Sequence, residues 1–328
     1  MNLKGKSYLV TGGTGFIGAG LIQGLLAAGA RVRSLDNNSR GSADRLGKIA
    51  LHVELVTGDI RDPAAVGRAV RGMDSVCHLA YVNGTEFFYS KPDLVLEVAV
   101  KGMMNVLDAC LAHGVGELVL ASSSEVYQTP PRVPTDETAP LVVPDVLNPR
   151  FSYGGGKIIC ELLAINYGRA RLQRVLIFRP HNVYGPNMGW EHVIPQFALR
   201  LRELHRGQPA GSLRFPIQGN GQETRSFTYI DDLVSGVLRM MEHGQHLNVY
   251  HIGSGLETTI ADLAHEVARC FGREISLAAG ALQPGSTLRR CPDISKLRAL
   301  GFVPEVSLAD GLARTVPWYD QNAHLKPK

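Results

Sequence analysis

Short apolar segments alternate with amphipathic ones over the first 180 residues, and this alternation constrains the fold more than any other feature of the chain. Runs typical of buried strands lie at 7–11, 31–36, 52–57, 75–80, 117–122 and 174–179. Segments with apolar residues at helical spacing lie between them, at 16–28, 63–71, 92–113 and 153–170. Strands and helices in this order predict an α/β fold with a doubly wound parallel sheet, covered by helices on both faces.

The alternation weakens after Pro180. Proline and glycine recur and the loops lengthen, although helices are expected at 230–242 and 259–271 and one more strand at 249–252. A smaller C-terminal lobe is therefore predicted beside the sheet. We expect the sheet domain to span 1–180, with returning segments at about 225–272, and the substrate-binding lobe to span 181–224 and 273–328.

Composition excludes several classes of protein. Of the 328 residues, 45% are hydrophobic and 20% are charged, which is typical of a globular chain. The net charge of +4 is scattered, so no nucleic-acid partner is expected. Five cysteines without C-x-x-C spacing predict free thiols in a reducing compartment. No leader precedes the first strand and no apolar run reaches the roughly 20 residues that span a bilayer, so we expect a cytoplasmic protein with no membrane partner.

A glycine-rich turn, Thr11-Gly-Gly-Thr-Gly-Phe-Ile-Gly18, joins the first strand to the first helix. Glycines at 12, 15 and 18 give a G-x-x-G-x-x-G spacing, and without Cβ atoms they let the backbone approach a pyrophosphate. The helix N-terminus supplies free N–H groups and a positive dipole end. Such a turn can be purely structural, but its place between strand and helix favours a dinucleotide site in a Rossmann-type sheet.

Two carboxylates follow the next strands. Asp36 ends the second strand, where a carboxylate can accept hydrogen bonds from the adenosine ribose hydroxyls. It would repel a 2′-phosphate, so NAD is favoured over NADP. Asp59 follows the third strand and is a candidate for the adenine edge, although a place in the helix N-cap region before Asp62-Pro63 is an equal alternative.

Tyr153 and Lys157 are four residues apart on a predicted helix, so they share one face. A nearby ammonium favours the phenolate, and we expect it to lower the pKa of Tyr153 toward working pH. Tyr153 is then a usable base for an alcohol that is being oxidised. The same spacing is common in surface pairs, but here it opens a helix after a long proline-rich loop, and such loops are usually functional.

A serine-rich segment, Ser122-Ser-Ser-Glu125, follows the fifth predicted strand. Ligands of open α/β sheets bind at the carboxyl ends of the strands, and a serine hydroxyl there can both donate to and accept from a substrate hydroxyl. A polar turn is the alternative interpretation.

These motifs belong to a longer ordered set that covers nearly the whole chain. Its members are 11–18, Gly58-Asp-Ile-Arg-Asp62, His78-Leu-Ala80, 122–127, Tyr153-x-x-x-Lys157, Arg179-Pro-His-Asn-Val-Tyr-Gly-Pro186, 219–232 and Arg290-Cys-Pro-Asp-Ile-Ser-Lys296. The set resembles the extended short-chain dehydrogenase/reductase family of NAD-dependent nucleotide-sugar epimerases, dehydratases and decarboxylases.

The resemblance implies an enzyme that acts on a nucleotide-diphosphate sugar through a bound 4-keto intermediate. Tyr153 would remove the proton of the 4-hydroxyl while a hydride passes from C4 to bound NAD, with Ser123 hydrogen-bonded to the same hydroxyl. Lys157 would hold the nicotinamide ribose. The implied cofactor-binding residues are Gly12, Gly15, Phe16, Ile17, Gly18, Asp36, Asn37, Asp59, Ile60, Leu79, Ala80, Ser122, Tyr153, Lys157 and Pro180. The implied substrate-binding residues are Ser124, Asn182, Val193, Arg225 and Arg290, and no metal is expected.

Glu125 bears on what happens to the 4-ketone. A plain 4-epimerase needs no further acid or base, and many lack a carboxylate here. Dehydratases of the family carry Glu, often beside Asp, whereas uronate decarboxylases resemble the Ser-Glu of this chain more closely. Our hypothesis is that Glu125 acts at C5 or C6, and the alternative is that it only pairs with Arg225 or a loop donor. A net reductase and a non-catalytic NAD-binding module are the competing classes.

Several positions depart from the pattern of the family. The residues between Tyr153 and Lys157 are all glycine, Gln128 replaces a glycine, Ala99 replaces an asparagine, and the stretch 81–89 differs throughout. The resemblance also implies a homodimer in which the helices at 92–113 and 153–170 pair with their copies in a four-helix bundle. Cys110 and Cys160 are expected in that bundle.

Overall fold

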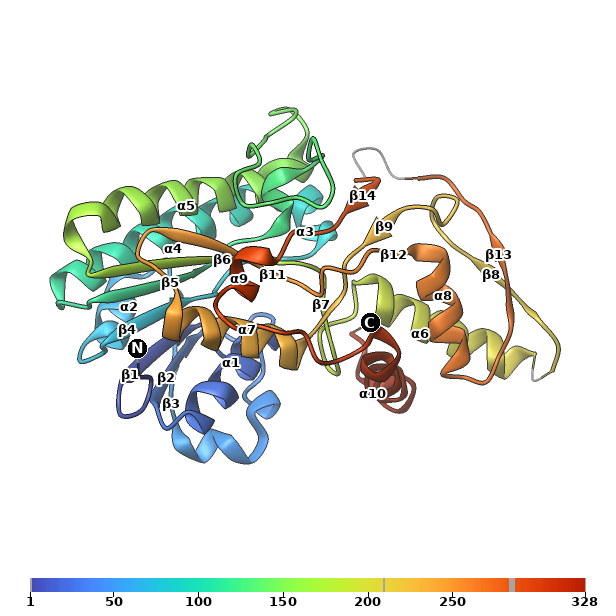
Figure 1. Cartoon of the computed structure of the whole chain (residues 1–328). Helices are drawn as coiled ribbons and strands as arrows, with labels where there is room; N and C mark the ends of the chain where they lie inside the picture. Colours follow the sequence, from blue (N-terminus) through green and yellow to red (C-terminus); the bar gives the residue numbers. More distant parts are fainter. Residues whose placement is uncertain (1, 209, 283–286, 328) are drawn as a thin grey trace.

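The structure is a computed structural model that describes residues 2–208, 210–282 and 287–327. These residues include a seven-stranded parallel sheet with the order β11-β6-β5-β4-β1-β2-β3. The strand order reverses at the neighbours β1 and β4, which places the topological switch point there. The predicted doubly wound sheet is therefore confirmed (Figure 1). Its strands are β1 Ser7–Thr11, β2 Arg31–Asp36, β3 Val53–Thr57, β4 Ser75–His78, β5 Glu117–Ala121, β6 Arg174–Pro180 and β11 Asn248–Ile252.

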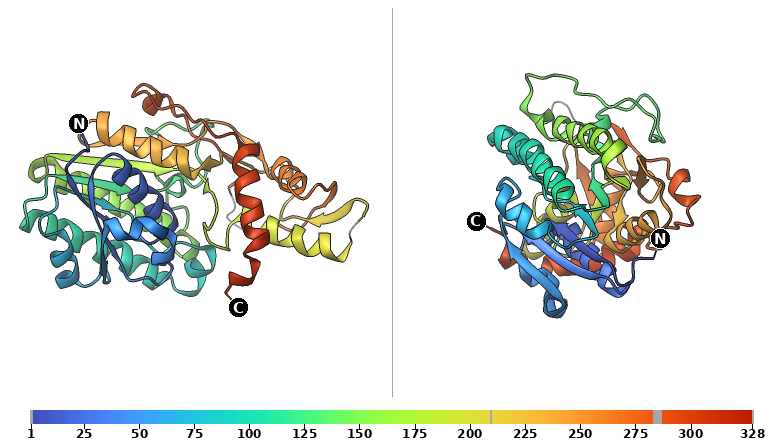
Figure 2. Two further views of the ribbon diagram at one scale, coloured as in Figure 1. Left: turned by 90° about the horizontal axis from the view of Figure 1, so that it is seen from below. Right: turned by 90° about the vertical axis from the view of Figure 1, so that its left-hand side faces the viewer.

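Both faces of the sheet are covered, because successive strand residues point to opposite sides. On β1, Tyr8 and Val10 enter one apolar cluster and Leu9 enters the other. Helices α1 (Phe16–Ala27) and α7 (Ile230–His243) cover the first face. Helices α2 (Pro63–Val70), α4 (Pro92–Ala112) and α5 (Ser152–Arg171) cover the second, as Figure 2 shows from two further sides.

The helices α4 and α5 pack side by side on the second face. Cys110 and Cys160 lie on these helices, but both are buried in the cluster between helices and sheet. Their side chains are therefore buried within the subunit, and Cys160 donates to the Ala99 oxygen on α4 at 3.5 Å, while the intersubunit bundle itself stays a prediction. All five cysteines are free, and only Cys270 is exposed.

A third apolar cluster forms the core of the smaller lobe, which extends to the right in Figure 1. It joins α6 (Val193–Gly207), α8 (Ile260–Arg269) and α10 (Leu308–Gln321). Other short elements of this half of the chain are β7 Val183–Tyr184, β8 Leu213–Pro216, β9 Thr224–Arg225, β10 Thr228–Tyr229, β12 Thr258–Thr259, β13 Ile275–Ala278, β14 Arg289–Arg290, α9 Ser295–Arg298 and η4 Ala323–Leu325.

Two segments pack differently from the expected division of the chain. Leu263 and Val267 of α8 belong to the lobe cluster, although α8 lies within the segments expected to return to the sheet domain. Leu297 of α9 and Phe302 pack in the sheet cluster with α7, although both fall in the segment expected to form the lobe.

Four further short elements lie at the edges of the sheet. They are η1 Ala43–His52, α3 Thr85–Ser90, η2 Ser124–Tyr127 and η3 Pro149–Phe151. Within the described part of the chain, no helix has both the length and the apolar character needed to cross a membrane.

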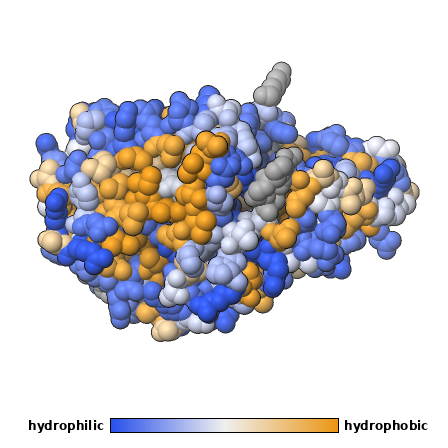
Figure 3. All heavy atoms as spheres, turned by 90° about the horizontal axis from the view of Figure 1, so that it is seen from above, coloured by the Kyte–Doolittle hydropathy of each residue, from blue (hydrophilic) through white to orange (hydrophobic). Residues whose placement is uncertain are grey.

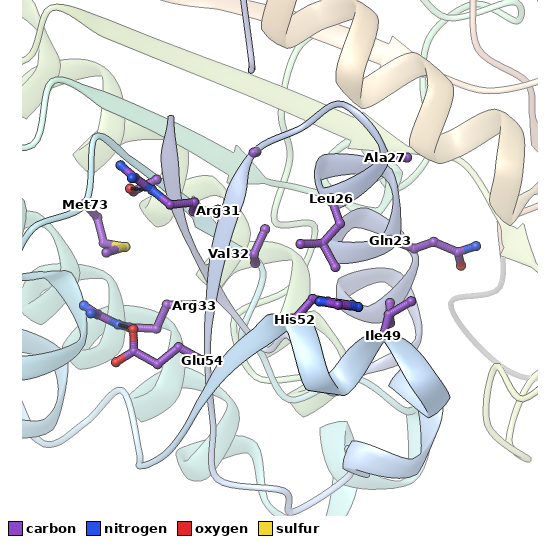
Figure 4. Close-up of a pocket in the computed structure, with 12 residues that line it drawn as sticks. Gln23, Leu26, Ala27, Arg31, Val32, Arg33, Ile49, His52, Glu54 and Met73 are labelled. Atoms are coloured by element: carbon purple, nitrogen blue, oxygen red, sulfur yellow. Dashed lines mark hydrogen bonds and ion pairs between the residues drawn. The ribbon is translucent and has the colours of Figure 1, made fainter. Parts of the chain in front are cut away.

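A cavity of about 820 Å³ opens at the amino-terminal end of the sheet. Its lining includes Ser7, Arg31 and Glu54, which stand at or near the starts of β1, β2 and β3 (Figure 4). Ligands of open α/β sheets bind at the opposite, carboxyl end of the strands. The residues predicted from the motifs all lie outside this cavity, so we look for the active site at the other end.

Candidate active site

The turn between β1 and α1 is built from backbone packed on backbone. Gly12 has φ +72°, and a Cβ atom there would lie 2.8 Å from the Ala80 nitrogen. A Cβ atom on Gly18 would lie 2.1 Å from the Gly12 oxygen. Only glycine fits at these positions, which leaves an open backbone surface at the N-terminus of α1. Such a surface fits the pyrophosphate of a dinucleotide.

Asp36 supports this turn from the end of β2. One of its carboxylate oxygens accepts a hydrogen bond from the Thr14 nitrogen at 3.0 Å, and the other accepts from the Asn38 nitrogen at 2.9 Å. A carboxylate oxygen has two acceptor sites, so each can still bind a ribose hydroxyl. These two backbone hydrogen bonds therefore hold Asp36 at the position predicted for recognition of NAD.

Asp59 is held by its neighbour Arg61. The guanidinium donates to both carboxylate oxygens, at 3.0 and 2.8 Å, and lowers the pKa of Asp59 to about 2. Asn37 donates a third hydrogen bond to this carboxylate at 3.1 Å. The N-cap of α2 is Asp62, whose side chain accepts from the Ala64 nitrogen at 2.9 Å. The N-cap role, one of the two alternatives for Asp59, therefore belongs to Asp62.

Several other predicted cofactor residues serve the interior of the protein. The nitrogens of Leu79 and Ala80 each donate to the Thr11 hydroxyl at 3.2 Å. Ser122 donates its hydroxyl to the buried Glu161. Ile60 is buried in the second apolar cluster. Their contact with the cofactor stays a prediction, as it does for Phe16, Ile17 and Pro180.

Tyr153 lies in the first turn of α5 and is buried against Phe88 and Val95. It shares a hydrogen bond with Ser123, which lowers its pKa, but burial has the larger effect and raises the pKa to about 12. The sequence predicted the opposite direction. The physical reason is that the ring lies in an apolar cluster contributed by distant segments, which penalises the phenolate.

Lys157 lies one turn beyond Tyr153 but is directed elsewhere. Its Nζ donates to the Ala121 oxygen at 2.7 Å and stands 3.9 Å from the centre of the Tyr81 ring. Burial lowers the pKa of Lys157 to about 8. The lysine is therefore positioned by the end of β5 and by the Tyr81 ring, which sequence reasoning did not identify.

Glu125 forms an ion pair with Arg290 on β14, with 2.5 Å between the carboxylate and the guanidinium. Burial alone would raise the pKa of Glu125, but Arg290 outweighs it with help from Arg150 and Arg225, and the pKa is lowered. The anticipated partners were Arg225 or a loop donor, so the partner is a different arginine. Arg290, expected at the nucleotide, is here tied to Glu125 and to the Thr287 hydroxyl at 2.8 Å.

The other predicted substrate residues lie on separate elements, and only Arg225 is shown to act on Glu125. Asn182 has φ +33°, and its buried amide oxygen has no hydrogen-bond partner among the described residues. Arg225 is partly buried, and burial lowers its pKa to about 10. Ser124 is buried, and Val193 opens α6. A polar atom without a partner and an arginine beside Glu125 fit a polar anionic ligand.

A buried charge network beneath the serine-rich segment was not predicted. Arg179 on β6 binds both oxygens of Glu161 on α5, at 2.8 and 2.6 Å, and also donates to the Tyr127 hydroxyl. Glu161 in turn accepts from Ser122. The network locks α5 to β6, to Ser122 and to the end of η2. Arg179 begins a recognised motif, which was the one available signal.

The described residues form no cluster of side chains that fits a metal ion. No group of three or more His, Cys, Asp or Glu side chains there is arranged to hold a metal ion.

Comparison with known proteins agrees with this geometry. The model of the NAD dependent epimerase/dehydratase family matches residues 8–253. A UDP-glucuronic acid decarboxylase of Arabidopsis thaliana is 33% identical over 93% of this chain and 86% of its own length. A dTDP-glucose 4,6-dehydratase structure from Streptomyces venezuelae, with NAD bound, has 32% identity and a TM-score of 0.85, covering 98% of each chain.

A UDP-glucose 4-epimerase structure from Thermus thermophilus, in complex with NAD, is also similar. It has 28% identity and a TM-score of 0.83, and the match covers 95% of this chain and 98% of the epimerase. The family model and the similar proteins point to the same family, and the glycine turn supported by Asp36 fits it. The chain therefore belongs to the NAD-dependent epimerase/dehydratase family, with NAD as its cofactor.

Proposed function

We propose that this enzyme oxidises C4 of a nucleotide-diphosphate sugar to a bound 4-ketone and then uses the Glu125–Arg290 pair at C5 and C6. Decarboxylation of a nucleotide-linked uronate is the outcome that we favour. The observation that carries this proposal is the charged Glu125, held beside Tyr153 and surrounded by three arginines.

Tyr153 is the group that exchanges a proton with the 4-hydroxyl, and Ser123 orients both partners through its hydroxyl. The chemistry supplied by bound NAD is reversible oxidation at C4, together with a positive ring charge that favours a neighbouring phenolate. Lys157, one helical turn beyond Tyr153, would add a second positive charge. These two charges oppose the burial that raises the pKa of Tyr153.

The choice among outcomes depends on which groups surround the ketone. Dehydration needs a base for the C5 proton and an acid for the departing C6 hydroxyl. Ser124 stands where dehydratases often carry Asp, and the pKa of Glu125 is lowered, so neither of these two residues supplies an acid for C6. A uronate needs no such acid. Its C5–C6 bond breaks, the electron pair moves toward the C4 ketone, carbon dioxide leaves, and C5 takes up a proton from a water molecule that Glu125 would orient. The hydride then returns to C4 and Tyr153 returns the proton to the C4 oxygen, so that oxidation and reduction balance.

The arginines favour the same substrate class. Arg150, Arg225 and Arg290 bring three positive charges to the region of Glu125, where Glu223 adds a second negative charge near Arg225. We propose that Arg225 and Asn182 bind the diphosphate end and that the remaining positive charge faces the carboxylate of the sugar. Dehydration is the second candidate, supported by the 32% identity to a dTDP-glucose 4,6-dehydratase across almost the whole chain.

The test is mass spectrometry of products formed from UDP-, GDP-, dTDP- and CDP-linked hexoses and hexuronates in the presence of NAD. Loss of carbon dioxide from one uronate supports the proposal. Loss of water from a neutral hexose would contradict it in favour of dehydration. Unchanged masses with a new epimer by NMR would identify a plain 4-epimerase and leave Glu125 without a role in the reaction.

A paired set of variants tests the role of Glu125 itself. Glu125→Gln should abolish the step after the ketone while oxidation at C4 continues, which a transient NADH absorbance would report. The matched control is Glu257→Gln, because Glu257 forms a similar pair with the adjacent Arg289 at 2.8 Å but on the exposed side of β14. Equal losses in the two variants would contradict a specific role for Glu125.

We also propose a homodimer formed through α4 and α5. Leu96 on α4 and Ile159 and Leu162 on α5 are exposed on the outer face of this pair, and Figure 3 shows a continuous apolar area there. Light scattering at micromolar concentration should give a dimer, and Leu162→Glu should give a monomer. A monomeric parent protein would refute this assembly.

Two further proposals concern organisation and location. We propose that the lobe core is formed by α6, α8 and α10, while α9 and its neighbours return to the sheet domain.

Five free cysteines support a reducing, cytoplasmic environment. Limited proteolysis and cell fractionation would test these two proposals separately.

A further inference from the structure

Three departures from the pattern of the family meet at one point in the structure. A Cβ atom on Gly156 would lie 2.3 Å from the Tyr81 hydroxyl and 2.9 Å from the Ala99 Cβ. Tyr81 follows β4, Ala99 lies on α4 and Gly156 lies on α5. The small residues on the two helices therefore provide the space that the hydroxyl end of Tyr81 occupies.

From this space Tyr81 contacts both members of the catalytic pair. Its ring centre lies 3.9 Å from the Lys157 Nζ and 5.1 Å from the centre of the Tyr153 ring, at an interplanar angle of 79°. Its hydroxyl donates to the Tyr153 backbone oxygen at 3.2 Å. Tyr81 thus contacts the ammonium, the phenol ring and the backbone of the turn that carries them.

The charge of Lys157 needs such a contact. The lysine is buried, and an isolated buried ammonium tends to lose its proton. Its hydrogen bond is to the neutral Ala121 oxygen. Three titratable groups also face it: His78 on β4, and Cys160 and Glu161 on α5. Glu161 is already bound by Arg179, and burial keeps His78 and Cys160 neutral near pH 7.

We propose that Tyr81 is a positioning residue, which holds Lys157 charged through the face of its ring and fixes the first turn of α5 through its hydroxyl. The link to catalysis rests on the proposed function, in which Lys157 supports Tyr153. The contact with Lys157 can be tested without any substrate. Ala99 and Gly156 leave the space that the Tyr81 side chain fills, so the three departures form one structural feature.

The test compares two replacements by the pH titration of the Lys157 ammonium, followed by NMR in ¹⁵N-lysine-labelled protein. Tyr81→Phe keeps the ring face and loses the hydroxyl. Tyr81→Leu keeps much of the apolar volume and loses the ring, and Tyr81→Met serves if the leucine variant does not fold. The Lys157 signal is assigned as the one absent from Lys157→Met.

We expect the Lys157 titration to stay in place in Tyr81→Phe and to move down by about one pH unit in Tyr81→Leu, the shift that a desolvated cation–π contact supports. Identical titrations in the two variants would overturn the proposal, because a residue that only fills space would give that result. On an accepted substrate, the alkaline limb of kcat should move in parallel. If no substrate is accepted, the proposed function fails while the NMR result still decides the role of Tyr81.

Discussion

Two glycine-rich turns open helices at the same end of the sheet, and glycine is required in them for different reasons. In the cofactor turn, 11–18, backbone limits the Cβ positions of Gly12 and Gly18: the Ala80 nitrogen for Gly12 and the Gly12 oxygen for Gly18. Gly13 is the exception, because a Cβ atom there would meet the Ser34 side chain. In the catalytic turn, 153–157, side chains intrude. Gly156 faces the Tyr81 hydroxyl, and Gly154 faces the Gln128 side-chain amide at 2.7 Å, with the backbone carbonyl of Glu125 beside it at 2.9 Å.

This difference separates what the fold requires from what this chain has added. A turn packed on its own backbone is the same wherever a dinucleotide lies on a helix N-terminus. A turn packed on particular side chains depends on where those side chains come from. Gln128 itself has φ +52°, a conformation that favours glycine. Its side-chain amide donates to the backbone carbonyl of Glu125. The catalytic turn therefore depends on side chains from other segments, and the two turns should respond differently to mutation.

The largest expected effect belongs to Tyr153→Phe. Loss of the phenol removes the proton-transfer group, so turnover should fall by about 10²–10⁴-fold. NAD binding, measured by calorimetry, should change little because the cofactor turn is untouched. Retained turnover would overturn the assigned mechanism, and loss of NAD binding would show that the two turns are not separate in function.

Gly18→Ala should be the most damaging change in the cofactor turn. The new methyl group would lie 2.1 Å from the Gly12 oxygen, and backbone cannot move aside without rebuilding the turn. We expect a loss of about 1–3 kcal/mol in the free energy of unfolding, or more, with weakened NAD binding. Gly15→Ala is the control for stability, since its methyl group would lie 3.1 Å from the same oxygen and Gly15 has an ordinary φ of −71°. Equal denaturation midpoints for the two variants would contradict this ranking.

The same contrast explains how far the sequence predicts the molecule. The sheet and the cofactor turn follow from alternation and glycine spacing, which are local properties. The helices α6 and α10 were not predicted, and each contains a proline, Pro195 and Pro317. The ion pair between Glu125 and Arg290 joins residues 165 positions apart. The direction of the Tyr153 pKa shift was wrong for the same reason, because the ring is buried by segments that come from elsewhere in the chain.

A matched pair within the catalytic turn tests its dependence on side chains. Gly155→Ala meets only the Val143 side chain at an ordinary 3.5 Å, so it should stabilise the helix by up to about 1 kcal/mol. Gly156→Ala lies in the same helical turn but meets the Tyr81 hydroxyl and the Ala99 methyl, so it should destabilise by about 1–2 kcal/mol. Urea unfolding of both variants measures the difference. Two stabilised variants would remove the argument that Tyr81 determines this glycine.

A pH dependence of stability that belongs to Lys157 alone is also expected. Its pKa is lowered to about 8 in the folded protein, whereas an unfolded lysine has its ordinary value of 10.5. Between these values the unfolded chain binds more protons than the folded one, so this residue makes stability rise with pH, by at most about 1.4 kcal/mol per pH unit.

The buried cysteines act in the opposite direction at alkaline pH. Burial raises the pKa of Cys110 and Cys160, so the folded state keeps protons that the unfolded state loses, and stability falls as pH rises. The contribution of Lys157 therefore has to be read as the difference in the free energy of unfolding between the parent protein and Lys157→Met, measured from pH 7 to pH 10. That difference should be constant below about pH 8 and then move in favour of the parent. A constant difference throughout would mean that Lys157 titrates normally, and that the catalytic turn does not confine its ammonium as the contacts with Ala121 and Tyr81 require.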